Sequence, residues 1–261
     1  MRELDLLRDR LEELDRVVVA FSGGADSAFL AWVANDVLGP ERAHAVTAIS
    51  ASLAPEEEDD CRALAAEWGL RWTPVVTAEL ESAAYRANDG DRCAHCKTAL
   101  MDVAGPLAEA EGATVVLGVN VDDLADPHRP GQAAAAARGA VFPLVEAGFT
   151  KELLRAESRR LGLRTWDKPA MACLASRVPY GTPVTMSVLS EVAAAESGLR
   201  RLGLRQLRVR HHGDVARIEV PLDDLDVVLA RRAEVVDAVR AAGYRYVALD
   251  LEGFRSGSLN R

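Results

Sequence analysis

The stretch RVVVAFSGGADS, residues 16–27, decides the fold of this chain. Its apolar run, residues 16–21, is typical of a parallel strand that is buried on both faces. The glycines that follow let backbone N–H groups approach an anion, and the helix that we expect from Ser27 to Val37 adds positive potential at its first turn. The stretch therefore predicts a strand, an anion-binding turn and a helix in direct succession.

Strand and helix patterns alternate from this stretch outward. Leucines at helical spacing predict a helix over residues 4–14, and Thr150 is a good N-cap for a helix that ends at Gly162. The other elements that we expect here are strands at 44–49, 71–76, 114–119 and 140–144, and helices at 55–68 and 96–111, the latter with a break or kink at Pro106. This alternation predicts a doubly wound, Rossmann-like parallel α/β sheet.

A second, smaller α+β domain follows a loop-like stretch at residues 165–185. We expect helices at 187–202 and 222–242 and strands at 207–210, 216–220 and 246–251. The chain is therefore divided into a nucleotide-binding domain, residues 1–167, and a small domain, residues 168–261.

Composition excludes several classes of protein. The chain has 261 residues, of which 49% are hydrophobic, so it is not a disordered chain. Its N-terminus has no apolar signal core, and no apolar run reaches the ~20 residues of a membrane helix. The net charge of −9 argues against a nucleic-acid partner. We expect a cytoplasmic protein that does not bind membranes.

The turn after the first strand has the chemistry of a phosphate site. Gly23 and Gly24 open the backbone, and the hydroxyls of Ser22 and Ser27 can donate hydrogen bonds to phosphate oxygens. Asp26 does not suit a pure anion site and indicates a Mg²⁺ ion instead. The lysine of a Walker motif is missing. Taken alone, the turn could equally be a tight, capped connection.

A second polar patch, residues 118–131, follows a later strand. It begins with Gly118 and contains Asp123. Ligands of open α/β sheets bind at the carboxyl ends of the strands, where both patches would lie. Taken alone, this patch could also be a polar loop with helix caps.

Four cysteines in such a chain do not suggest a disulfide scaffold. Cys93 and Cys96 form a C-x-x-C pair, which is compatible with half a zinc site, a redox pair or part of an iron–sulfur site. Cys173 stands alone in PAMACLASRVPYG, and Cys61, in an expected helix, is most simply a structural thiol.

The combination of motifs resembles one family. SGGADS at 22–27 is similar to the PP-loop of the ATP-pyrophosphatase superfamily, and GVNVDD at 118–123 is similar to a second segment of these enzymes. With RCAHCKT at 92–98 and KPAMACLASRVPYG at 168–181, the whole chain resembles the LarE family. These enzymes are ATP-dependent sulfurtransferases that act on pyridinium-3,5-biscarboxylic acid mononucleotide during assembly of the nickel-pincer nucleotide of lactate racemase.

The resemblance implies roles for several residues. Ser22, Gly23, Gly24, Asp26, Ser27, Gly118 and Asp123 would bind ATP with Mg²⁺, and Asp26, Cys173 and Arg177 would be catalytic. Cys173 would carry the sulfur. With Cys93 and Cys96 present, the resemblance points to a [4Fe–4S] cluster on three thiolates. Sacrifice of the Cys173 sulfur and a persulfide on Cys173 are the alternatives.

The small domain supplies cations for a nucleotide substrate. Arg208 and Arg210 alternate along an expected strand and so share one face, where they suit a phosphate or carboxylate, although solvated surface arginines fit the same pattern. By resemblance, the substrate-binding residues are Glu196, Arg208, Arg210, Glu219 and Arg255.

The partners implied are a small-molecule nucleotide, a sulfide source and other proteins of nickel-pincer nucleotide synthesis, and we expect a homo-oligomer. The alternative functions are a PP-loop tRNA thiolase, which the acidic composition disfavours, and a nucleotide-sensing module, which would bind ATP without releasing pyrophosphate. A C-x-x-C redox protein is a weaker alternative, because no thioredoxin-like βαβ unit surrounds the motif.

Overall fold

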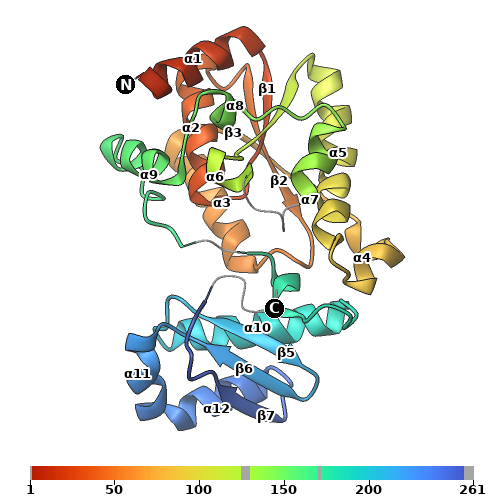
Figure 1. Cartoon of the computed structure of the whole chain (residues 1–261), viewed down its shortest axis with the longest axis vertical. Coiled ribbons are helices and arrows are strands. Elements are labelled where there is room, and N and C mark those ends of the chain that lie inside the picture. Colours follow the sequence, from red (N-terminus) through yellow and green to blue (C-terminus); the bar gives the residue numbers. More distant parts are fainter. Residues whose placement is uncertain (1, 125–129, 170–171, 256–261) are drawn as a thin grey trace. The chain divides into compact units, whose positions relative to one another are not determined.

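The computed structural model describes residues 2–124, 130–169 and 172–255, which form two compact units (Figure 1). The first unit comprises residues 1–50, 55–79 and 90–171, and the second comprises residues 51–54, 80–89 and 172–261. Two short segments that lie between elements of the first unit in sequence therefore belong to the second.

The first unit is built on a four-stranded sheet. Its strand order is β3-β2-β1-β4, and all the pairs are parallel. The strands are β1 (Val17–Ala20), β2 (Ala43–Ile49), β3 (Arg71–Val76) and β4 (Thr114–Leu117). Ala20, the last residue of β1, is paired with Val46 of β2 and Leu117 of β4. The predicted parallel α/β sheet is confirmed.

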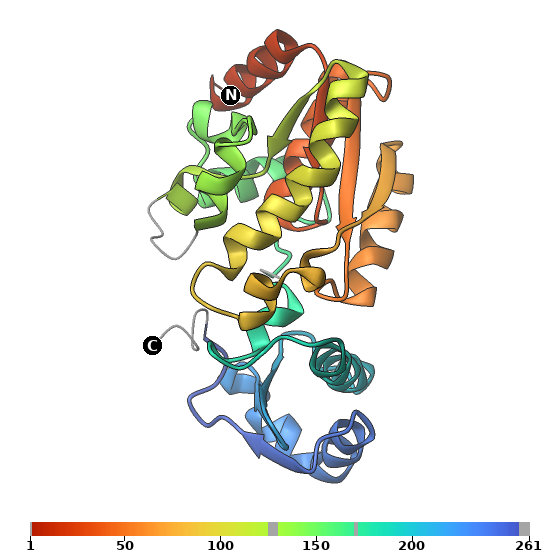
Figure 2. The ribbon, with the colours of Figure 1, turned by 90° about the vertical axis from the view of Figure 1, so that its right-hand side faces the viewer.

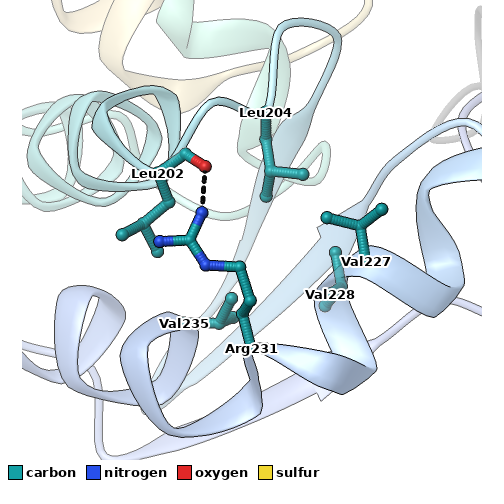
Figure 3. A pocket seen from close by; sticks show the side chains of 6 residues that line it. All are labelled: Leu202, Leu204, Val227, Val228, Arg231 and Val235. Carbon is teal, nitrogen blue, oxygen red and sulfur yellow. Dashed lines mark hydrogen bonds between the residues drawn. The ribbon is translucent and has the colours of Figure 1, made fainter.

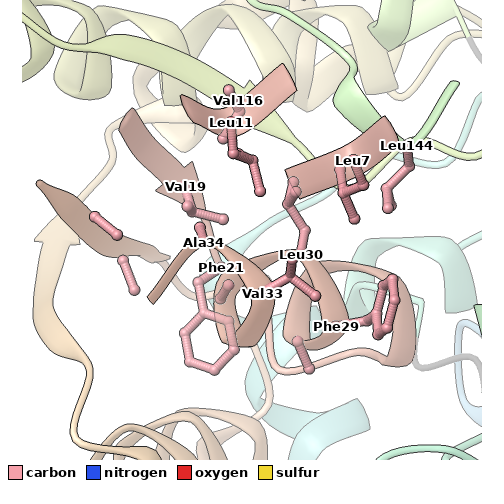
Figure 4. Packing of buried hydrophobic residues seen from close by; sticks show 14 of the residues in the cluster. Leu7, Leu11, Val19, Phe21, Phe29, Leu30, Val33, Ala34, Val116 and Leu144 are labelled. Atoms are coloured by element: carbon pink, nitrogen blue, oxygen red, sulfur yellow. The ribbon is translucent and has the colours of Figure 1, made fainter. Parts of the chain in front are cut away.

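Helices cover both faces of this sheet. Alternate residues of β1 point to opposite faces. Val17 and Val19 belong to the hydrophobic cluster that includes α1 (Arg2–Leu14) and α2 (Ala25–Leu38), and Figure 4 shows this packing. Val18 belongs to the opposite cluster, with residues of α5 (Arg92–Glu111), which Figure 2 shows in yellow. The remaining helices of the unit are α3 (Pro55–Trp68), α6 (Val121–Leu124), α7 (Pro130–Ala136), α8 (Pro143–Glu146) and α9 (Lys151–Arg160). A 3-10 turn at Glu79–Glu81 begins in this unit and ends in the second.

Three expectations about local structure need correction. Helix α5 begins at Arg92 rather than Cys96, so the C-x-x-C pair lies inside it, and it continues through Pro106 because its buried residues pack on the sheet. The strand expected at 140–144 is reduced to a single bridge between Val141 and Val116, since Pro143 starts α8. The helix expected at 222–242 is divided into a 3-10 turn and two helices.

The second unit carries its own sheet and core. Strand β6 (Val215–Glu219) lies between β5 (Arg208–His212), which is antiparallel to it, and β7 (Tyr246–Leu249), which is parallel to it. Residues of α10 (Met186–Arg201), α11 (Leu225–Ala230) and α12 (Arg232–Ala241) pack with this sheet in one cluster. The other elements are α4 (Ala83–Ala87) and 3-10 turns at Leu174–Arg177 and Leu222–Asp224.

A pocket in this unit is lined mainly by aliphatic side chains. Figure 3 shows Leu204, Val227, Val228 and Val235 around it, with Arg231 donating a hydrogen bond to the carbonyl of Leu202. Because no nucleophile or carboxylate lines this pocket, the candidate site lies elsewhere. No helix within the described residues is long and apolar enough to cross a membrane.

The N-terminal helix should contribute strongly to stability. The side chain of Leu11, on α1, is fully buried, whereas Leu6 on the same helix is 43% exposed. We expect Leu11→Ala to lower the free energy of unfolding by about 2–5 kcal/mol, because it removes packed methyl groups and leaves a cavity. The control Leu6→Ala should change it by less than about 1 kcal/mol. Chemical denaturation measures both, and equal losses would contradict the packing described here.

Candidate functional site

The PP-loop connects the end of β1 to the start of α2. Gly23 has a φ of +69°, a region that favours glycine, and a Cβ atom built on it would lie 2.9 Å from the sulfur of Cys61. Gly24 is the N-cap of α2, and no side chain caps this helix. The first backbone amides of a helix have no intrahelical partner, so this end of α2 can receive an anion.

Two serines close the loop on itself. The hydroxyl oxygens of Ser22 and Ser27 are 3.0 Å apart, and the backbone N–H of Ser22 donates to the Ser27 hydroxyl over 3.2 Å. The Ser27 hydroxyl lies 3.2 Å from the carbonyl oxygen of Gly24. The two expected phosphate donors, the hydroxyls of Ser22 and Ser27, therefore lie at the N-terminus of α2 and are hydrogen-bonded to each other.

The second predicted patch lies directly beside this loop. A Cβ atom on Gly118 would come within 2.8 Å of both the N and Cα atoms of Ser27, so only glycine allows the end of β4 to pack on α2. Beyond it, Asn120 and Asp123 exchange hydrogen bonds between side chain and backbone, at 3.3 and 3.1 Å. Residues 125–129 of the patch lie outside the described residues.

The carboxylate of Asp26 lies close to both a cation and a second carboxylate. Its Oδ2 atom is 3.4 Å from Nζ of Lys151, while its Oδ1 atom is buried and has no hydrogen-bond partner in the described part of the chain. Burial raises the pKa of Asp26, and repulsion from Asp123 adds to the rise, against the attraction of Lys151. Two neighbouring carboxylates with an unused oxygen are the donor set that Mg²⁺ prefers. The expected magnesium role of Asp26 fits these residues.

Lys168 is a cation at the loop that the sequence did not indicate. Its Nζ atom lies 2.8 Å from Glu57 and 2.7 Å from Asp60, and it would be 3.7 Å from a Cβ atom on Gly23. Burial lowers the pKa of Lys168, but hydrogen bonds to the two carboxylates outweigh it and raise the pKa overall. The chain has only three lysines, at 97, 151 and 168, and two of them lie at the PP-loop. Because almost all the basic residues of this chain are arginines, each of the few lysines stands out in the sequence. That scarcity is the signal that could have indicated Lys151 and Lys168.

The C-x-x-C pair lies at the start of α5. Cys93 and Cys96 are one helical turn apart, a spacing that brings side chains to the same face of a helix. Cys93 is exposed and Cys96 is partly exposed. Gly131 of α7 packs closely here, since a Cβ atom on it would lie 2.8 Å from the carbonyl oxygen of Cys93. Within the residues that the structure describes, no group of three His, Cys, Asp or Glu side chains is placed to hold a metal ion.

Cys61 differs from the other thiols. It is fully buried in α3, and burial raises its pKa from 9.0 to about 11. Its sulfur fills the space beside Gly23, so it shapes the PP-loop by packing.

Cys173 lies in the second unit, directly before the 3-10 turn Leu174–Arg177, and it is exposed. The neighbouring residues 170–171 of its motif lie outside the described residues. Arg177 and Glu196, by contrast, are buried and form a two-pronged ion pair at 2.8 and 3.1 Å. Of these three, only Cys173 offers its side chain to solvent.

The expected substrate-binding residues separate into two kinds. Arg210 and Glu219 are buried and pair with each other at 2.9 Å, and Arg255 is partly exposed and pairs with Glu252. Arg208 is also buried, but no described residue accepts a hydrogen bond from its guanidinium, which stacks 4.5 Å from the ring of Phe254. Burial, with Arg177 and Arg210 nearby, lowers the pKa of Arg208 to about 10. Arg208 is therefore the buried cation of this unit best suited to receive an anion.

Comparisons with known proteins agree with the loop chemistry. Residues 2–99 match the NAD synthase family. The chain is 47% identical over 265 residues to an uncharacterized protein of Synechocystis sp., with 99% of this chain and 97% of that protein covered. It is 38% identical over 250 residues to the pyridinium-3,5-bisthiocarboxylic acid mononucleotide synthase of Lactiplantibacillus plantarum, with 96% and 91% covered. An uncharacterized protein of Methanocaldococcus jannaschii is 22% identical over 268 residues, with 98% of each chain covered.

Replacing Gly118 should both destabilise the protein and weaken nucleotide binding at the loop. We expect Gly118→Ala to lower the free energy of unfolding by about 1–3 kcal/mol and to weaken ATP binding, because its Cβ would push the backbone of Ser27 away. Gly90→Ala is the matched control, since a Cβ atom there meets nothing within 4 Å. Calorimetric titration with ATP measures the effect. Unchanged affinity in the Gly118 variant would contradict the assigned contact.

Thiol reactivity should separate Cys61 from the exposed cysteines. A pKa raised from 9.0 to about 11 lowers the thiolate fraction at pH 8 about 100-fold, and burial slows access further. We expect iodoacetamide to modify Cys93 and Cys173 well before Cys61, with the Cys61 rate rising as pH approaches 11. Peptide mass spectrometry of the metal-free protein measures this, and guanidinium-unfolded protein is the control in which the difference disappears. Equal native rates would contradict the burial of Cys61.

Proposed function

The chain belongs to the LarE family of PP-loop, ATP-dependent enzymes, and from this premise we propose that it converts carboxylates of pyridinium-3,5-biscarboxylic acid mononucleotide into thiocarboxylates for the nickel-pincer nucleotide. The observation that carries the proposal is the 38% identity along 96% of the chain with a protein named for the bisthiocarboxylic product. In this proposal, residues 1–167 bind ATP and residues 168–261 serve the substrate and the sulfur transfer.

Adenylation is the first step. A substrate carboxylate oxygen attacks the α-phosphorus of ATP, the bond to the β-phosphate oxygen breaks, and pyrophosphate leaves. The unpartnered amides of α2 and the hydroxyls of Ser22 and Ser27 hold the pyrophosphate, and Asp26 and Asp123 hold the Mg²⁺ that neutralises it. The ammonium groups of Lys151 and Lys168 supply the charge that a Walker lysine supplies in other nucleotide sites.

Sulfur transfer is the second step. Adenylation makes the carbonyl carbon electrophilic and turns one of its oxygens into part of a good leaving group, AMP. A sulfur nucleophile presented at Cys173 then attacks this carbon, and AMP departs with the oxygen. One activation serves one carboxylate, so the dithio product needs two ATP molecules.

Three cysteine thiolates suit an iron–sulfur cluster. Thiolates are the soft ligands that such clusters prefer, and Cys93 and Cys173 are exposed while Cys96 is partly exposed. We propose that Cys93, Cys96 and Cys173 hold a [4Fe–4S] cluster. Three thiolate ligands would leave one iron of such a cluster without a protein ligand, and the cluster would there supply the sulfide for transfer. A sulfide donor would then restore the enzyme between turnovers.

Arg208 is the residue that we assign to the anionic groups of the substrate. A buried guanidinium is costly unless an anion pairs with it. Arg208 makes no ion pair with a described residue, and the attraction of Glu219 and Glu196 does not prevent the fall of its pKa. A phosphate or carboxylate accepts paired hydrogen bonds from a guanidinium, and the negative charge would also relieve its repulsion by Arg177 and Arg210.

The decisive experiment separates the two steps and measures the metal. Anaerobically purified protein should contain about four iron atoms and four acid-labile sulfides per chain, which Cys93→Ser should lose. With ATP and substrate it should release AMP and pyrophosphate and form several thiocarboxylates per chain. Cys173→Ala should still adenylate the substrate but form no thiocarboxylate, whereas Cys61→Ser, which nearly keeps the side-chain volume beside Gly23, should retain both steps.

Three outcomes would count against parts of the proposal. A colourless, iron-free protein that still makes several thiocarboxylates per chain would exclude the cluster. A single thiocarboxylate per chain, with loss of sulfur from Cys173, would indicate a sacrificial cysteine. Binding of ATP without release of pyrophosphate in the presence of substrate would reject the enzyme itself.

A further inference from the structure

The backbone around Cys173 is held by two buried arginines. Nη1 of Arg177 donates hydrogen bonds to the carbonyl oxygens of Ala172 and Cys173, at 2.6 and 3.3 Å, and reaches the Ser176 hydroxyl at 3.0 Å. Nη1 of Arg210 donates to the carbonyl oxygen of Ser176 at 2.8 Å. Two guanidinium groups thus fix three backbone carbonyls within five consecutive residues.

Each arginine is itself locked by a buried carboxylate. Arg177 donates to both oxygens of Glu196, at 2.8 and 3.1 Å, and Arg210 donates to Glu219 at 2.9 Å. The side chains of both arginines are 2% exposed, and those of both glutamates are 0% exposed. We call Arg177, Glu196, Arg210 and Glu219 the arginine bracket.

The bracket is anchored to the rest of the unit. Glu196 on α10 also accepts a hydrogen bond from the backbone N–H of Val209 on β5, at 3.1 Å. Glu219 on β6 is also bonded by Arg217 at 3.1 Å. The bracket therefore ties the Cys173 turn to a helix and to two strands.

The other side of the turn is fixed as well. The backbone N–H of Leu174 donates to the carbonyl oxygen of Ser52 at 2.8 Å, and the Ser52 hydroxyl is bonded to the hydroxyl of Tyr85. Held from both sides, the backbone leaves the thiol of Cys173 exposed, while the side chains of Leu174 and Ala175 are buried.

The energetic cost of buried ion pairs indicates that the bracket serves to orient the backbone of the Cys173 turn more than to stabilise the fold. Apolar residues of similar volume often stabilise a protein as well as a buried ion pair does, because the charges lose their hydration. Paired hydrogen bonds from arginine, however, fix orientation in a way that apolar contacts do not. A sulfur nucleophile must meet a carbonyl carbon within a narrow range of positions, and a misplacement of about 1 Å can lower a rate about 100-fold.

We propose that the arginine bracket fixes the backbone of residues 172–176 and thereby aims the Cys173 thiol. In this proposal its four members are positioning residues. The resemblance implied instead that they contact the substrate directly. The inference rests on the proposed function of Cys173 for its catalytic consequence only. It leaves Arg208 as the cation of this strand that meets the substrate.

The test uses a charge-neutral double variant, Arg177→Met with Glu196→Gln. The glutamine oxygen can still accept from Val209, so no buried charge is left unpaired within this pair. We expect thermal unfolding within a few degrees of the natural protein and unchanged adenylation. Hydrogen exchange of the amides at 174–178 should become at least about 10-fold faster, and the sulfur-transfer rate should fall about 100-fold with the substrate KM unchanged.

Two further variants keep the test decisive. Arg201→Met is the matched control, because Arg201 lies on the same helix α10 but bonds the hydroxyl of Ser197 at 3.0 Å instead of a member of the bracket, so exchange and sulfur transfer should stay unchanged. Arg177→Lys keeps the charge but loses the fork, so it should reproduce the faster exchange and slower transfer, even if the double variant fails to fold.

The outcomes distinguish the two proposals. Unchanged exchange and unchanged sulfur transfer in both Arg177 variants would overturn the bracket. A raised substrate KM with an unchanged rate would also overturn it, since Arg177 would then contact the substrate directly. Hydrogen exchange needs neither cluster nor substrate, so faster exchange in a protein that never forms a thiocarboxylate would support the bracket while rejecting the proposed function.

Discussion

The close approach of β4 to the first turn of α2 organises the first unit. Parallel pairing of β1 with β4 brings the ends of both strands to the same edge of the sheet. Only the missing side chain of Gly118 lets the second loop then pack on the backbone of Ser27. This contact brings Asp123 near enough to Asp26 to raise its pKa, and the neighbouring pair of carboxylates follows from it.

The second unit solves a different problem by different means. Its exposed thiol cannot be held by glycines, which supply no contacts of their own. Buried ion pairs, Arg177 with Glu196 and Arg210 with Glu219, instead hold the backbone around this thiol. Such pairs are costly to desolvate, so the remaining acceptor capacity of the two glutamates needs donors, and Arg200, Arg217 and the backbone N–H of Val209 provide them.

Sequence patterns predicted the elements that local chemistry determines. The strand before Ser22, the cap at Thr150 and the helix from Pro55 to Trp68 all follow from periodicity and capping, and the structure contains them. A break at Pro106 and a strand at residues 140–144 were wrong predictions, because their outcome depends on packing. A helix continues through a proline when its buried face is held, and a short apolar run becomes a bridge when a proline follows it.

The partners of charged side chains were beyond the reach of sequence patterns. Alternation correctly placed Arg208 and Arg210 on one strand, but it could not tell that Arg210 pairs with Glu219 while Arg208 stacks on the ring of Phe254. That difference is tertiary, because it depends on which residues of β6 and of the segment after β7 face each arginine. Lys151 and Lys168 were missed for the same reason, since each reaches the PP-loop from a distant part of the sequence.

The two units also divide the cations according to their chemistry. An ammonium is a compact charge with three rotatable donors, so Lys168 can hold Glu57 and Asp60 and still turn toward an arriving phosphate. The guanidinium of Arg177 bonds one carboxylate through two of its nitrogens and two backbone carbonyls through the third. It must therefore break several hydrogen bonds to move. Lysine therefore suits the loop, where we propose that a nucleotide binds. Arginine suits the turn around Cys173, where the geometry must stay the same.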